Sequence, residues 1–122
     1  MNACPFCDLN LRTIIAENDA AVAFYDGFPV SPGHVLVIPR RHCSDFFQLS
    51  LSEQTACLDL LNQCQKQLSE RNPDGFNIGV NVGSAAGQTI FHAHLHLIPR
   101  YLGDVENPRG GVRGVIPAKK DY

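Results

Sequence analysis

Three histidines, His92, His94 and His96, stand at alternate positions and are separated by Ala93 and Leu95. Side chains of a β-strand alternate between the two faces of a sheet, so this spacing predicts that all three imidazoles project from one face. A strand rises ~3.3 Å per residue, which places neighbouring histidines ~6.6 Å apart and the outer two ~13 Å apart. A single metal ion does not easily collect ligands over that span. We therefore expect the three histidines to have different roles.

The composition limits the class of protein. A chain of 122 residues is long enough for one domain with a hydrophobic core, and 44% hydrophobic with 18% charged residues is typical of globular proteins. A net charge of −2 argues against coating nucleic acid or binding a membrane surface. The apolar runs are too short to span a bilayer, the N-terminus lacks the pattern of a signal peptide, and five cysteines do not suit a complete disulfide framework. We expect a cytoplasmic protein.

Four segments before the histidines have the apolar or alternating pattern of strands: residues 14–15, 20–25, 34–38 and 76–81. Phe24 is expected to point inward, and Pro39 is expected to stop the third strand. Between the third and fourth segments, Ser50 and Glu53 have the spacing of a capping box, which predicts a helix that runs to about Glu70. Its apolar residues follow helical periodicity and predict one buried stripe, formed by Cys57, Leu60, Leu61, Cys64 and Leu68. Strands around one long helix predict an α+β fold with a mainly antiparallel sheet.

The loop at residues 81–89 leads directly into the histidine segment. Gly87 allows a ligand to approach the backbone closely, and the N–H groups of a tight turn can point at an anion. The amide of Gln88 and the hydroxyl of Thr89 can donate further hydrogen bonds. Alone, such a loop is more often an ordinary hairpin turn. Beside histidines, which act as nucleophiles near pH 7 or as cationic partners of phosphate, it predicts a phosphate-binding loop.

Cys4 and Cys7 form a closely spaced pair near the N-terminus. Three interpretations compete: half of a zinc site, a thioredoxin-like redox pair, or coincidence. A redox pair normally lies between a strand and the helix that it opens, whereas only three residues precede Cys4. Zinc prefers four tetrahedral nitrogen or sulfur ligands, and His42 and His92 are the candidates for the other two. A closed site of four protein ligands would be structural.

Residues 92–98, HAHLHLI, match the signature of the histidine triad family, and the chain resembles that family in one register over roughly residues 4 to 101. The resemblance is to its nucleotide hydrolases, among them bacterial diadenosine-tetraphosphate-hydrolase-like and Hint proteins. These enzymes cleave a nucleoside monophosphate from a leaving group at the α-phosphate. The resemblance implies one domain over residues 1–122, built as a sandwich of a five-stranded antiparallel sheet and one long helix. It also implies a homodimer with a ten-stranded sheet, and a tail at residues 102–122 that lies near the active site.

The resemblance assigns roles to single residues. His94 would be the nucleophile, with Nε2 attacking the α-phosphorus to form a nucleotidyl-histidine and Nδ1 donating to the carbonyl of His92. His96 would bind α-phosphate oxygens, and His34 would support the imidazoles. Asp26 would accept the ribose hydroxyls, although without the resemblance it is equally a turn aspartate. The other implied substrate-binding residues are Asn81, Gly87, Gln88 and Thr89 for the phosphate, and Phe6, Leu9 and Phe24 for the base. Each of the last three could equally be a core residue.

Some relatives, including galactose-1-phosphate uridylyltransferases and certain bacterial members, hold a structural zinc ion on a cysteine pair and two histidines. The matching residues here are Cys4, Cys7, His42 and His92. The resemblance therefore implies one structural zinc ion per chain. Many members of the family lack the cysteine pair and work without zinc.

The leading expectation is a hydrolase that acts on purine nucleotides. A dinucleoside polyphosphate such as diadenosine tetraphosphate would need cations beyond the α-phosphate, which Arg109 and Arg113 of the tail can supply. A phosphoramidate or an aminoacyl adenylate, as for Hint, would not. Two other classes are a nucleotide-binding module without catalysis, against which the intact His94 argues, and a zinc-stabilised interaction domain. Transfer to a sugar phosphate is disfavoured, because those transferases are larger and usually contain two such domains.

Overall fold

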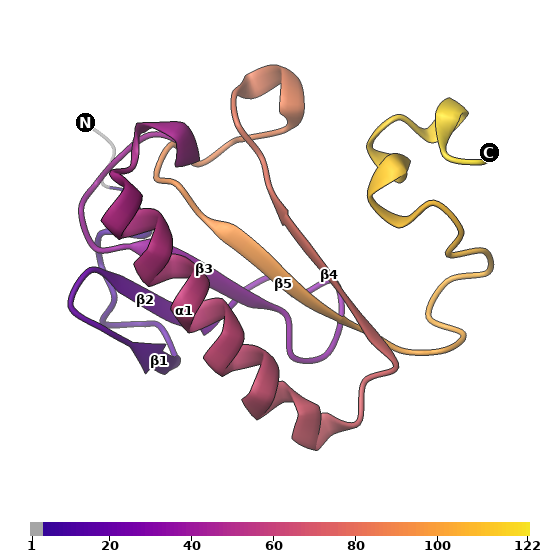
Figure 1. Cartoon of the computed structure of the whole chain (residues 1–122), viewed down its shortest axis with the longest axis horizontal. Coiled ribbons are helices and arrows are strands. Elements are labelled where there is room, and N and C mark those ends of the chain that lie inside the picture. Colours follow the sequence, from indigo (N-terminus) through magenta and orange to yellow (C-terminus); the bar gives the residue numbers. More distant parts are fainter. Residues whose placement is uncertain (1–3) are drawn as a thin grey trace.

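The computed structural model describes residues 4–122. Its five strands form one antiparallel sheet in the order β1-β2-β3-β5-β4, and one long helix crosses that sheet (Figure 1). The strands are β1 (Ile14–Glu17), β2 (Ala21–Tyr25), β3 (Val35–Pro39), β4 (Gly75–Val80) and β5 (Leu95–Arg100). The helix is α1 (Leu51–Leu68). The predicted five-stranded sheet with one long helix is confirmed.

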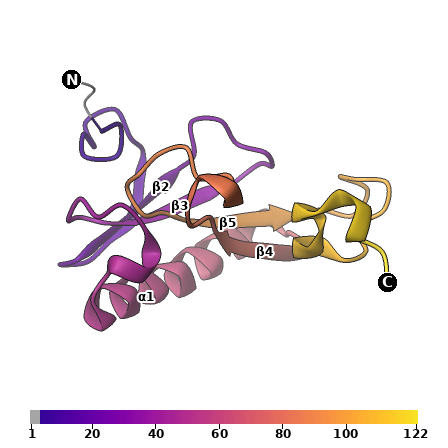
Figure 2. The same cartoon turned by 90° about the horizontal axis from the view of Figure 1, so that it is seen from above.

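The sheet is covered on both faces along β2 and β3. Ala21 and Ala23 of β2 belong to the core cluster beneath α1, whereas Val22 and Phe24 belong to a second cluster that includes Phe6. Figure 2 shows α1 on one side of the sheet and the N-terminal segment on the other. Alternation along one strand thus supplies two separate cores, and Phe24 is fully buried in the second.

The capping box predicted at the start of α1 is present. The Ser50 hydroxyl accepts a hydrogen bond from the Glu53 N–H at 3.1 Å, and the Glu53 carboxylate accepts one from the Ser50 N–H at 3.0 Å. Two hydrogen bonds from Arg41 to that carboxylate lower the pKa of Glu53 to about 2, with the Ser50 N–H as a further cause. The helix ends at Leu68, slightly before the predicted end, and a 3₁₀ turn over Ser69–Arg71 follows it. The five predicted stripe residues of α1 are all buried.

One expectation about the histidine segment is corrected. Only His96 lies in β5, whereas His92 and His94 precede that strand. The pairing of β5 with β3 stops at Val37. Two residues further on, Pro39 has no N–H for the ladder, and its carbonyl accepts a hydrogen bond from the His92 imidazole at 2.8 Å instead. A side chain therefore replaces the backbone bond that would have lengthened β5.

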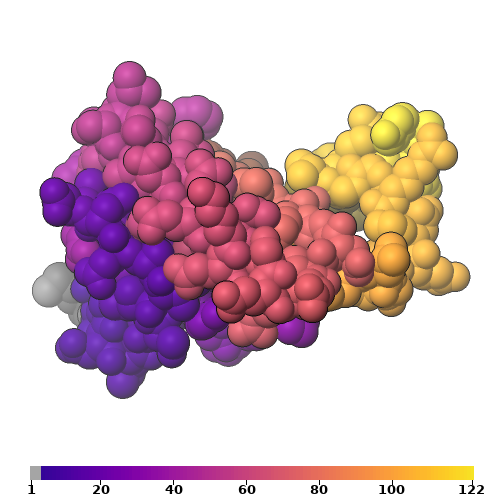
Figure 3. Space-filling model, turned by 60° about the horizontal axis from the view of Figure 1, so that its bottom comes forward, coloured from indigo at the N-terminus to yellow at the C-terminus, as the bar shows by residue number. Residues whose placement is uncertain are grey.

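The chain beyond β5, the tail, extends past the edge strand β4. This tail contains two 3₁₀ turns, over Gly111–Val115 and Pro117–Lys119. Figures 1 and 3 show this tail, in yellow, standing away from the body at the end that carries the C-terminus. Between residues 4 and 122, no helix is both long and apolar enough to cross a membrane.

Replacing Leu60 by alanine should destabilise the fold by about 2–5 kcal/mol, because this fully buried side chain of α1 would leave a cavity under the sheet. Leu58 lies on the same helix and is 46% exposed, so Leu58→Ala is the matched control and should cost less than about 1 kcal/mol. Urea denaturation of the three proteins measures both values. Equal losses in the two variants would contradict the proposed packing of α1.

Candidate active site

His94 is held by the backbone of the histidine that precedes it. Its Nδ1 lies 2.8 Å from the carbonyl oxygen of His92, and its side chain is buried. A carbonyl oxygen only accepts hydrogen bonds, so the proton of a neutral His94 is on Nδ1 and its Nε2 keeps the lone pair. The geometry thus sets the tautomer that a nucleophilic imidazole requires.

A second chain of hydrogen bonds fixes the tautomer of His96. The backbone N–H of Val30 donates to Nδ1 of His34 at 3.1 Å, so the proton of a neutral His34 is on Nε2. That Nε2 lies 2.9 Å from Nδ1 of His96, which must then be the acceptor. His96 consequently carries its proton on Nε2, where it can donate to an anionic oxygen. Asp26 supports this arrangement, with a carboxylate oxygen 3.5 Å from Nε2 of His34.

Burial keeps these imidazoles neutral. Burial is the largest cause that lowers the pKa of His96 from 6.5 to about 4, and the nearby His94 and His34 contribute to the same direction. Burial also lowers the pKa of His34, against the opposing effect of Asp26. Neutral His34 and His96 at pH 7 agree with the tautomers that their hydrogen bonds require.

A cavity of about 460 Å³ opens in front of His94 and His96. Five of the predicted substrate-binding residues line it: Phe6, Asp26, Asn81, Gly87 and Thr89. Gly87 has φ of 93° and open space where a Cβ would be, so only glycine fits the backbone there without strain and leaves room for a ligand. The ring centroids of Phe6 and His94 are 5.1 Å apart, which makes Phe6 an apolar neighbour of His94.

The structure does not place Gln88, Leu9 or Phe24 on the wall of this cavity. The Gln88 side chain is buried and engaged: its Oε1 accepts from the Gly83 N–H at 2.9 Å, and its Nε2 donates to the Ser44 carbonyl at 2.6 Å. The Gln88 side chain therefore links the two ends of the loop at residues 83–88 and connects that loop to the segment after β3. Phe24 lies underneath in the second core cluster, and Leu9 packs against that cluster.

Several residues that line the cavity have no signal in the sequence pattern. They are Arg12 and Phe28, together with Pro5, Leu36 and Ile90. Arg12 lies in a turn ahead of β1, and Phe28 follows Asp26 closely enough that its backbone N–H donates to the Asp26 carboxylate at 2.8 Å. Phe28 is 92% exposed, so its ring can contact a molecule bound in the cavity. Because this exposure is known only from the structure, neither Phe28 nor Arg12 could have been found from the sequence pattern.

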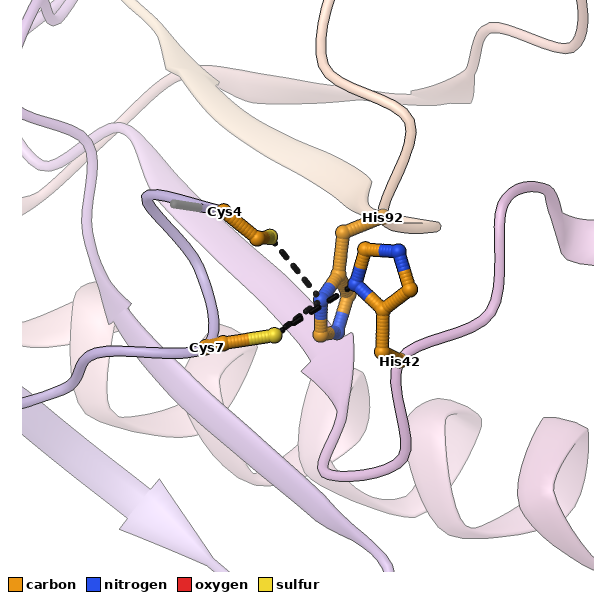
Figure 4. Close-up of side chains that lie close together, drawn as sticks. All are labelled: Cys4, Cys7, His42 and His92. Carbon is orange, nitrogen blue, oxygen red and sulfur yellow. Dashed lines mark hydrogen bonds between the residues drawn. The ribbon is translucent and has the colours of Figure 1, made fainter. Parts of the chain in front are cut away.

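Cys4, Cys7, His42 and His92 come together beside the cavity (Figure 4). The Cys4 sulfur lies 3.4 Å from Nδ1 of His92, and the Cys7 sulfur lies 3.4 Å from Nδ1 of His42. Ligands of a tetrahedral zinc ion are separated by roughly 3.3–3.8 Å, given zinc–sulfur and zinc–nitrogen bonds of about 2.3 and 2.0 Å. The Pro39 carbonyl accepts the Nε2 proton of His92, so Nδ1 faces the cysteines with its lone pair. These residues fit a structural zinc ion.

A second cavity, of about 490 Å³, shares His96 and Asn81 with the first and is also lined by His34. Its walls are mainly apolar and include Val112 and Val115 of the tail. No lysine or arginine of the described chain lines it. The tail therefore contributes to a cavity that reaches the histidines, and that cavity lacks the cations that a polyphosphate would need.

Arg109 and Arg113 are engaged within the tail itself. Each guanidinium lies 4.9 Å from the ring centroid of Tyr122. Arg113 donates to the carbonyl of Lys119 at 2.7 Å, and Arg109 donates to the carbonyl of Tyr122. In this arrangement the two arginines hold the tail together and do not face either cavity.

The sequence is similar to proteins with a HIT domain, and the model of the HIT domain family matches residues 10–103. A HIT-like protein of Mycoplasma genitalium is 42% identical over 82% of this chain and 74% of its own length. An adenosine 5′-monophosphoramidase of Schizosaccharomyces pombe is 34% identical over 80% and 74%, respectively. An AP-4-A phosphorylase of Mycobacterium tuberculosis is 30% identical over 75% of this chain but only 48% of its own length.

The similar solved structures belong to the same family as these sequence relatives. A HIT family protein from Bacillus anthracis has a TM-score of 0.78 and 38% identity, covering 83% of this chain and 75% of that one. A zinc-bound histidine triad family protein from Mycobacterium smegmatis has a TM-score of 0.79 and 32% identity, covering 86% and 80%. At these identities the likeness extends beyond the fold to the sequence itself.

The free energy of unfolding should fall as the pH is lowered from about 6.5 to about 4. The pKa of His96 is about 4 in the folded protein against an ordinary value of 6.5, so in this window the unfolded chain binds a proton that the folded chain does not. Urea denaturation at several pH values measures the slope. His96→Asn removes one titrating group and should make the slope shallower without abolishing it, because burial lowers the pKa of His34 as well. An equal slope in both proteins would contradict the assignment.

Proposed function

This chain belongs to the HIT domain family, as its histidine segment indicates, and on that premise we propose that it is a nucleotide hydrolase with His94 as the nucleophile. The observation that carries the proposal is the orientation of His94. With Nδ1 bonded to the His92 carbonyl, the unprotonated Nε2 is the atom available to the cavity that Asp26, Gly87 and Thr89 line. A nucleophile, a carboxylate for a ribose and donors for a phosphate thus share one cavity.

In the proposed reaction, Nε2 of His94 forms a bond to the α-phosphorus while the bond from phosphorus to the leaving group breaks, and the leaving group takes up a proton. Water then attacks the phosphorus, the phosphorus–nitrogen bond breaks, and a nucleoside monophosphate is released. The His92 carbonyl stabilises the positive charge on the His94 ring. The Nε2 proton of His96 and the hydroxyl of Thr89 are the donors for oxygens that gain charge in the transition state.

The apolar cavity favours a phosphoramidate or an aminoacyl adenylate as the substrate. His96 borders both cavities, and we place the nucleotide in the cavity at His94 and its leaving group in the other. An amine or an aminoacyl group suits apolar walls without cations better than a chain of phosphates does. The similarity to an adenosine 5′-monophosphoramidase supports the same choice.

A dinucleoside polyphosphate remains the second candidate. Its support is the similarity to an AP-4-A phosphorylase, of which this chain spans about half. The expectation from sequence depended on Arg109 and Arg113, which would have to leave Tyr122 to reach a phosphate. A phosphoramidate, from which an amine leaves, therefore becomes the leading proposal for the substrate.

We further propose that the four-residue cluster holds one structural zinc ion and that the protein is a homodimer. Cys4, Cys7, His42 and His92 supply a complete set of ligands, and zinc there would connect the N-terminal segment to the histidine segment. For the dimer, β4 is a sheet edge, and pairing with β4 of a second copy would give a ten-stranded sheet. The reduced cysteines suit the cytoplasm, where we place the protein.

His94→Asn should lower turnover by at least about 10³-fold, because the variant lacks the nucleophile and water must attack directly. The assay follows release of the nucleoside monophosphate from adenosine 5′-phosphoramidate, a lysyl-adenylate mimic, and diadenosine tri- and tetraphosphate. We expect the first two to be the faster substrates. Retained turnover in a well-folded His94→Asn protein would refute the nucleophile, and faster cleavage of the tetraphosphate would reverse the preference for the leaving group.

Purified protein should contain about one equivalent of zinc, and Cys7→Ala should contain less than about a tenth of that. Cys43→Ala is the matched control, because Cys43 adjoins His42 but lies outside the cluster and is bonded elsewhere. Elemental analysis gives the metal content, and a chelator titration gives the affinity. Wild-type protein without zinc after growth in zinc-supplemented medium would refute the site.

A further inference from the structure

Arg12 is a cation at the nucleotide cavity with no carboxylate partner among the described residues. Its guanidinium carbon lies 5.2 Å from the ring centroid of Phe6 and 5.0 Å from that of Phe24. One of its N–H groups donates to the carbonyl of Pro5 at 3.0 Å. Cation–π contacts with two buried rings and one hydrogen bond therefore fix a partly buried positive charge in the cavity wall.

In the binding mode proposed above, Arg12 lines the part of the cavity that is left for the base. The phosphate must reach His94, and the ribose must reach Asp26, so the base takes the remaining part of the cavity. Arg12 lies close to the residue after Asp26, because a Cβ added to Gly27 would be 3.8 Å from Nη1 of Arg12. The exposed ring of Phe28 offers an apolar face in the same region.

Arginine distinguishes purines by the groups at their edges. A guanidinium has five N–H donors in one plane and no acceptor, and the contact with Pro5 uses one of them. Guanine presents two adjacent acceptors, O6 and N7, whereas adenine presents N7 beside an amino group that donates. Two donors from Arg12 can therefore pair with a 6-oxopurine, while the adenine amino group would face another donor.

We propose that Arg12 is a specificity-determining residue that makes this site prefer 6-oxopurine nucleotides, with guanine or hypoxanthine as the base, over adenine nucleotides. The proposal rests on the nucleotide hydrolase function proposed above and adds the class of base. Its physical basis is the fixed guanidinium beside Phe6, Phe24 and Gly27. Apolar contacts from Phe6 and Phe28 alone would not separate guanine from adenine.

The test is equilibrium binding of the reaction products, which does not depend on catalysis. Isothermal titration calorimetry should give a dissociation constant for GMP about tenfold lower than for AMP, near the low end for a bidentate arginine–guanine pair because Arg12 is only partly buried. In Arg12→Met, which keeps an unbranched apolar stem without donors, the ratio of the two constants should fall to about one. IMP should behave as GMP does.

Arg71→Met is the matched control, since Arg71 lies over the ring of Tyr25 at 5.6 Å and does not line the cavity. It should keep the wild-type ratio. A 7-deaza-GMP probe lacks the N7 acceptor, so it should lose affinity for the wild type but not for Arg12→Met relative to GMP.

Three results would overturn the proposal in distinguishable ways. Equal affinity of the wild type for GMP and AMP would remove base selectivity and leave the hydrolase function intact. A loss of affinity for both nucleotides in Arg12→Met with an unchanged ratio, together with a lower melting temperature, would make Arg12 a purely structural residue. Failure of the folded wild type to bind either nucleotide would refute the proposed function itself.

Discussion

The hydrogen bond from Nδ1 of His94 to the carbonyl of His92 is the contact on which the site depends. Both histidines precede β5 and lie outside the sheet, so the sheet alone does not hold this hydrogen bond in place. The other side of His92 supplies the rigidity: its imidazole donates to the carbonyl of Pro39 and faces the sulfurs of Cys4 and Cys7. His92, which need not contact the substrate, thus sets the orientation of His94, which we propose does contact it.

Much of this architecture was predictable from local patterns. The capping box at Ser50 and the apolar stripe of α1 depend on neighbours three and four residues apart, so the sequence contains the whole signal. The exact start of β5 was not predictable, because it depends on Pro39, a residue more than 50 positions away whose carbonyl is taken by a side chain. Alternating histidines predict a common face, but they do not show where the ladder ends.

The site divides in the same way. His94 and Gly87 could be identified as site residues from the sequence, because their residue types and spacing are hard to explain by structure alone. Both line the cavity. Gln88 was expected to face substrate, but the pairing of its amide with the backbone could be known only from the folded loop. Arg12 had no sequence signal at all, because its position depends on two aromatic rings that come from separate segments of the chain.

The cluster of Cys4, Cys7, His42 and His92 also has a consequence for biosynthesis. Cys4 and His92 are separated by 88 positions, so the contact between them has one of the longest loops that this chain can close. During translation, the cysteines leave the ribosome first and wait for most of the domain to be made before their histidine partners are all available. Until then the thiols of the nascent chain lack these partners. The His92 contacts that orient His94 include this long loop, so assembly of the candidate active site must wait for synthesis of the chain up to the histidine segment.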